Sequence, residues 1–70
     1  MTSADFHALA QTFGLTVEMR YGEFLVIGSL FKAIDFQYAA VEKGATFMGT
    51  WGMPQVPGAP TQSTRRFMLA

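Results

Sequence analysis

The chain has 70 residues, no cysteine, and five acidic and five basic side chains, which leave a formal net charge of zero. The lack of cysteine excludes a disulfide framework and a thiolate metal site. The zero net charge disfavours nucleic-acid binding, which usually needs a basic excess. Charged residues make up 14% of the chain, against about a quarter in ordinary globular proteins. Because so few charges cover a small domain poorly, we expect a partner to cover apolar surface and predict a homodimer.

An amphipathic helix is predicted at the N-terminal end of the chain. Thr2 and Asp5 have the spacing of a capping box, in which two side chains satisfy free backbone amides at the start of a helix. An apolar stripe with helical spacing follows, and Gly14 stands where a left-handed residue ends many helices. The stripe consists of Phe6, Leu9, Ala10 and Phe13.

A β-hairpin is predicted after this helix, because polar and apolar residues alternate over residues 15–21. A two-residue turn at Tyr21 and Gly22 would place Arg20 opposite Glu23 as a charge pair. The same register gathers an apolar set on one face of the hairpin, namely Val17, Met19, Phe24 and Val26.

Leu25 and Ile27 would then lie on the opposite face, beside polar residues of the first strand. A strand that is apolar on both faces is usually central in its sheet or covered on both sides. In so small a chain, we expect a partner to provide that cover.

A second helix is predicted from Ser29, as its N-cap, to Gly44, as its C-cap. Most of its charged side chains fall on one side of the helical wheel and most apolar ones on the other. Phe36 breaks this pattern, because it falls among the charges within roughly 40° of Lys32. Two interpretations are open: Phe36 belongs to the core of a helix covered on two sides, or it is an exposed anchor of an interface.

Residues 45–53 predict a third strand, with Phe47, Trp51 and Met53 on one face. Gly49 marks a bulge or a close backbone approach within this strand. Residues 52–63 contain three prolines and predict an irregular loop.

Residues 64–69 predict a last strand, on which Arg65 and Arg66 point to opposite faces. We expect it at an edge of the sheet, where charges discourage unwanted strand pairing. The order α-β-β-α-β-β predicts one α+β domain over residues 1–70, with a mostly antiparallel sheet and its helices packed on one face.

No pattern in the sequence predicts catalysis. His7 is the single histidine, the serines lack a nucleophile elbow, and the carboxylates are scattered singly. The glycines form no phosphate-binding loop. We therefore expect no catalytic residues, no metal site and no cofactor.

The first residues lack the basic start and apolar core of a signal peptide. The longest apolar run, Phe24–Phe31, is interrupted and too short to span a bilayer. We expect a soluble, cytoplasmic protein without membrane contact.

These exclusions favour a small protein-binding module, such as an inhibitor or adaptor encoded by a virus or mobile element. An alternative is nucleic-acid binding through sheet aromatics, with phosphate contacts from Arg20, Arg65 and Arg66. A third hypothesis is a structural subunit of an assembly. The candidate protein-contact residues are those without an evident internal role or beside the proline-rich loop, namely Leu25, Ile27, Phe36, Trp51, Met53 and Val56.

Overall fold

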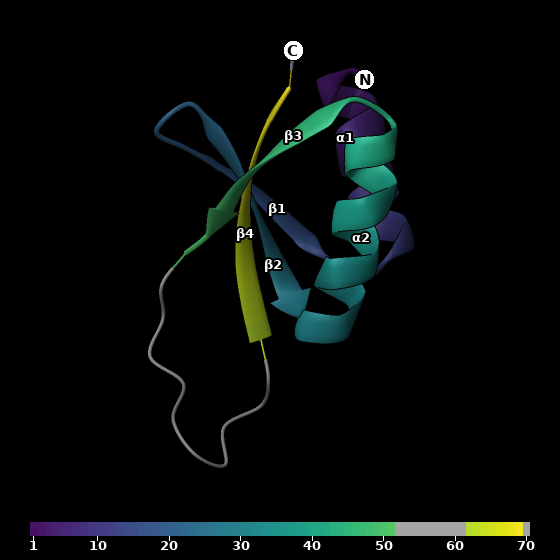
Figure 1. The fold of residues 1–70 in the computed structure, drawn as a ribbon, viewed down its shortest axis with the longest axis vertical. Coiled ribbons are helices and arrows are strands. Elements are labelled where there is room, and N and C mark those ends of the chain that lie inside the picture. Colours follow the sequence, from purple (N-terminus) through teal and green to yellow (C-terminus); the bar gives the residue numbers. More distant parts are fainter. Residues whose placement is uncertain (52–61, 70) are drawn as a thin grey trace.

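The computed structural model describes residues 1–51 and 62–69. The elements follow the order α1 (Ser3–Thr12), β1 (Thr16–Arg20), β2 (Glu23–Ser29), α2 (Leu30–Glu42), β3 (Ala45–Thr50) and β4 (Gln62–Leu69). The strands form one antiparallel sheet in the order β1-β2-β4-β3, and both helices lie over the same face of it (Figure 1). The predicted α+β class and element order are confirmed.

Both ends of α1 follow from local sequence. The backbone amide of Asp5 donates to Thr2 Oγ1 at 3.1 Å, and the amide of Thr2 donates to the Asp5 carboxylate at 3.4 Å. At the other end, Gly14 adopts a φ of +71° and the Leu15 amide donates back to the carbonyl of Ala10. These contacts confirm the predicted capping box and the predicted end of the helix at glycine.

The β1–β2 hairpin has the predicted register, with Arg20 opposite Glu23 across the turn. Tyr21 and Gly22 both have positive φ, as a tight hairpin turn requires. The predicted ion pair across the turn is wrong. Arg20 contacts Glu18 at 3.4 Å, because β2 has a second neighbour, β4, which supplies another partner to Glu23.

Strand β4 lies between β2 and β3, so the prediction that its arginines stand on an edge strand is wrong. It also begins earlier than predicted. Gln62 pairs with Ser29 and Ser63 pairs with Gly28, so these two residues extend the sheet and do not belong to the preceding loop. The rest of that predicted loop, residues 52–61, lies outside the described residues.

A β-bulge interrupts β3 at Gly49, so the structure supports the bulge over the other predicted alternative, a close backbone approach. Phe47 pairs with Phe67, but Gly49 pairs with the adjacent Arg66, so two residues of β3 oppose one residue of β4. Gly49 has a φ of +122°, which favours glycine. The extra residue shifts the alternation of side chains by one, so the prediction that Phe47 and Trp51 share a face is wrong.

Helix α2 begins after Ser29, as predicted, but the serine side chain makes no capping hydrogen bond. The helix ends before Gly44, whose φ is +106°. Ala33, Phe36 and Ala40 have no exposed surface. The inward face of α2 therefore consists of one large ring with a small residue on either side.

The core is a cluster of phenylalanines between the helices and the sheet. The ring of Phe36 packs edge-on against Phe6 of α1 at 5.2 Å and against Phe67 of β4 at 5.4 Å between centroids. The helix is thus covered by the sheet on one side and by α1 on another. Of the two interpretations of Phe36, the structure supports the core and excludes an exposed anchor.

Candidate interaction surface

Helix α2 exposes a row of apolar side chains on the flank opposite its contact with α1. We call this row the α2 stripe and define it as Phe31, Ile34, Tyr38 and Val41. At 100° per residue these four positions fall within about 80° of one another around the helix. Phe31 is 75% exposed, Tyr38 70% and Val41 46%, whereas Ile34 is half-buried. The stripe is the part of α2 that a partner can cover without unfolding the domain.

Two carboxylates border the stripe. Asp35 and Glu42 lie next to Phe31 on the helical wheel, within about 40° of it, and both are exposed. The stripe is therefore apolar along its centre and acidic along one rim.

Arg65 lies beneath α2, on the face of the sheet that the helices cover. Its Nη1 donates to Gln37 Oε1 at 2.7 Å, and its guanidinium carbon stands 5.6 Å from the centre of the Phe47 ring. Its Nε is buried and has no hydrogen-bond partner among the described residues. These contacts hold Arg65 inside the fold, where its charge packs against an aromatic face.

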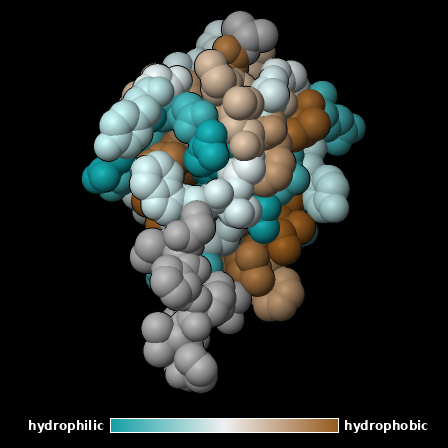
Figure 2. Space-filling model, turned by 60° about the vertical axis from the view of Figure 1, so that its left-hand side comes forward, coloured by the Kyte–Doolittle hydropathy of each residue, from teal (hydrophilic) through white to brown (hydrophobic). Residues whose placement is uncertain are grey.

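The other face of the sheet has no helix over it and comes forward in Figure 2, where hydrophilic and hydrophobic side chains are mixed. Arg66 crosses this face and donates from Nε and Nη2 to both carboxylate oxygens of Glu23, at 2.8 and 2.9 Å. The hydrogen bonds and charge of Arg66 lower the pKa of Glu23 below its usual range. A bidentate ion pair therefore joins the two central strands, β2 and β4, on this open face of the sheet.

The residues that the sequence analysis singled out for protein contact are scattered. Leu25 and Ile27 lie on the open face, as the register predicts, but Leu25 is only 4% exposed and Ile27 is half-buried. Trp51 is 40% exposed at the end of β3. Met53 and Val56 lie outside the described residues.

The three arginines proposed for the nucleic-acid alternative do not gather into one patch. Arg65 and Arg66 point to opposite faces of the sheet, as predicted, and each is held by a side chain of the domain. Arg20 stands on the edge strand β1 beside Glu18. This arrangement offers phosphate groups no continuous basic surface.

Phe31 and Tyr38 are exposed aromatics that the sequence analysis did not select as contact residues. Their spacing of seven residues places them on one line along α2, which the helical wheel already indicates. The helical wheel does not show which flank of α2 the rest of the chain covers.

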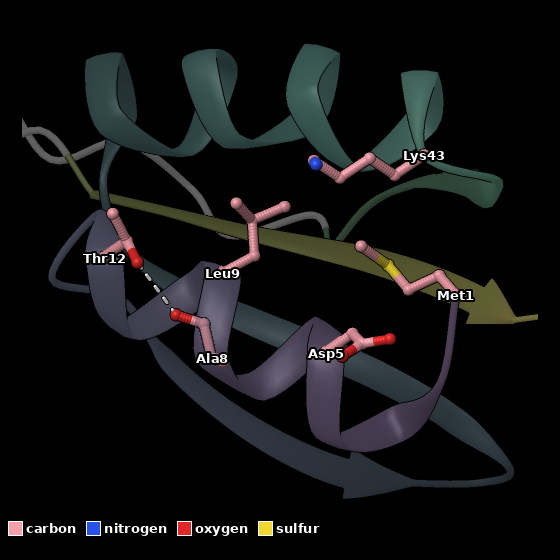
Figure 3. A pocket seen from close by; sticks show the side chains of 6 residues that line it. All are labelled: Met1, Asp5, Ala8, Leu9, Thr12 and Lys43. Atoms are coloured by element: carbon pink, nitrogen blue, oxygen red, sulfur yellow. Dashed lines mark hydrogen bonds between the residues drawn. The ribbon is translucent and has the colours of Figure 1, made fainter.

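A shallow groove of about 470 Å³ lies between α1 and the end of α2. Figure 3 shows Leu9 and Met1 pointing from the α1 side toward α2, with Lys43 reaching in from the other side. Hydrogen bonds with Thr2 lower the pKa of the Asp5 carboxylate. This carboxylate therefore caps the N-terminal end of α1. The groove is lined by Met1, Asp5, Ala8, Leu9, Thr12 and Lys43.

Within residues 1–51 and 62–69, no three histidine or acidic side chains stand close enough together to hold a metal ion. The same residues contain no helix of the length and apolarity needed to cross a membrane. No family model, curated protein or solved structure matches this chain.

Proposed function

We propose that this chain is a small protein-binding module without catalytic activity, and that it binds through the α2 stripe. The observation that carries the proposal is the exposure of two aromatic rings on one line of one helix, Phe31 at 75% and Tyr38 at 70%. Aromatic side chains on a rigid element are frequent anchors of protein interfaces, because each buries a large area at a low cost in side-chain entropy.

The free energy available from covering these rings supports the α2 stripe as the binding surface. Covering an aromatic side chain removes about 150–250 Å² from water, and each Å² of apolar surface contributes roughly 25 cal/mol. Two rings and the neighbouring Val41 therefore offer several kcal/mol to a partner. A helix whose apolar row fits a groove is a common mode of recognition between proteins.

The open face of the sheet supports binding less well. This face carries the ion pair of Arg66 and Glu23, and a partner covering that pair would remove both charges from water at a cost in free energy. A module that acts by occupying a surface would serve as an inhibitor or adaptor of a larger protein or complex.

The test is affinity capture of a partner protein from a native lysate, with three forms of the whole chain as bait. The first is the natural chain. The second carries Phe31→Ser and Tyr38→Asn, and the third carries Tyr21→Asn, which removes a ring that is 88% exposed at the hairpin turn. We expect the first and third forms to retain the same protein, and we expect the second form not to retain it. Equal retention by all three forms would contradict the proposal.

A further inference from the structure

The two edges of the sheet differ in regularity. Strand β3 forms one edge, and the bulge at Gly49 shifts its pairing with β4. Strand β1 forms the other edge, and all five of its residues pair with β2 in unbroken register. A bulge protects an edge strand from pairing with a further strand, whereas a regular edge is open to such pairing. Of the two edges, β1 is therefore the one that can accept another strand.

The outer side of β1 carries free backbone groups. The two-residue turn makes Arg20 and Glu23 a hydrogen-bonded pair, so the residues that alternate with Arg20 direct their N–H and C=O groups away from β2. These residues are Val17 and Met19, and no turn, loop or cap among the described residues forms a backbone hydrogen bond with them. The Met19 residue is also 61% exposed. The described part of the chain therefore leaves this edge uncovered at Met19.

We infer that the strand added at this edge is β1 of a second copy of this chain, paired antiparallel with Met19 opposite Met19. A two-fold axis through this pair lets the two Met19 residues exchange both backbone hydrogen bonds. The axis stands perpendicular to the sheet, so the two four-stranded sheets join into one sheet of eight strands with all helices on the same face. This surface is separate from the α2 stripe, and the inference therefore goes beyond the proposed function.

The charges on β1 favour a second copy and fix its register. With Met19 on the axis, Glu18 of each copy lies opposite Arg20 of the other, at a non-hydrogen-bonded position where facing side chains approach closely. Within one chain Arg20 and Glu18 lie 3.4 Å apart, on side chains that are 60% and 44% exposed, so both groups remain free to reach across the axis. An axis at Glu18 would instead set Glu18 against Glu18 of the second copy. Strand β1 is thus complementary in charge to itself in one antiparallel register.

Charge reversals test the pairing by sedimentation equilibrium of the whole chain. Glu18→Arg sets two arginines opposite each other and should raise the dissociation constant of the dimer roughly tenfold. Arg20→Glu sets two carboxylates opposite each other and should have the same effect. An equal mixture of the two variants should associate as tightly as the natural chain, because every facing pair is then opposite in charge. A mixture that associates no more tightly than either variant alone would overturn the inference.

Neutral substitutions test the register. Glu18→Gln removes both ion pairs across the axis and should raise the dissociation constant several-fold. Lys43→Gln removes one charge at the end of α2 and should leave the dissociation constant unchanged. A dimer that Glu18→Gln tightens would show that the two Glu18 carboxylates face each other, and this result would exclude the register with Met19 on the axis.

Amide hydrogen exchange identifies the edge at which the copies meet. The N–H groups of Val17 and Met19 should exchange more slowly as the protein concentration rises, because the second copy bonds them. The N–H groups of β3 should exchange at a rate that does not depend on concentration. A chain that remains monomeric at several hundred micromolar, or exchange at Met19 that does not change with concentration, would overturn the inference. Neither result affects the α2 stripe, which the capture experiment tests separately.

Discussion

Arg66 and Glu23 are 43 residues apart in the sequence, yet they form a bidentate ion pair across neighbouring strands of the sheet. The pair joins β4 to β2, the two central strands, on the open face of the sheet. It combines two charge-assisted hydrogen bonds in one planar geometry, which only an arginine can supply.

This pair predicts that the free energy of unfolding depends on pH in the acidic range. The hydrogen bonds and charge of Arg66 hold the Glu23 pKa below its ordinary value of 4.5. The unfolded chain therefore binds the proton more tightly, and the stabilisation, complete above about pH 4.5, is lost as the pH falls through the folded pKa. Chemical denaturation between pH 2 and 7 should show a smaller loss of stability for Glu23→Gln than for the natural chain.

In that variant the free energy of unfolding should still fall somewhat at acidic pH, because hydrogen bonds from Thr2 lower the Asp5 pKa as well. Identical slopes for Glu23→Gln and the natural chain would show that the ion pair adds nothing in solution.

Two phenylalanines on α2 should respond in opposite ways to the same substitution. Phe36→Ala leaves a cavity among core rings and should lower the free energy of unfolding by about 3–5 kcal/mol. Phe31→Ala, on a side chain that is 75% exposed, should change it by less than about 0.5 kcal/mol. Urea denaturation measures both changes. Similar losses in the two variants would contradict the assignment of core and surface.

Gly28 should resist a side chain because of one neighbour. A methyl group at this position would overlap the end of the Leu15 side chain, which is itself buried. Gly28→Ala should therefore destabilise the natural chain by about 1–3 kcal/mol. In a Leu15→Val background, which lacks the overlapping atoms, the same change should cost less. A double-mutant cycle measures the difference, and strict additivity would refute the contact.

Tyr21 offers a stabilising substitution. It is the one non-glycine with positive φ among the described residues, at +53°, and its ring is 88% exposed. Asparagine tolerates this conformation better and is favoured before glycine in such turns. Tyr21→Asn should raise the free energy of unfolding by about 1 kcal/mol. A lower melting temperature for this variant would show that the tyrosine ring contributes contacts that outweigh its backbone strain.

The local features of the fold were predictable from the sequence. The capping box of Thr2 and Asp5, the end of α1 at Gly14 and the register around Tyr21 and Gly22 each depend on residues a few positions apart. Hydrogen bonds and backbone conformations at that range are set by residue type and spacing. At Gly49 the sequence left a bulge and a close backbone approach both open, and the pairing of β3 with β4 decided for the bulge.

The tertiary structure decided the partners of side chains that meet distant segments. It placed β4 inside the sheet, which gave Glu23 its arginine, and it packed α1 beside α2, which buried Phe36. The same packing left Phe31 and Tyr38 uncovered. Periodicity shows which side chains share a face, but burial depends on which segments pack against that face. The sequence by itself therefore determined the order of the elements and the ends of the helices, and only their assembly decided which aromatic rings form the core and which remain exposed.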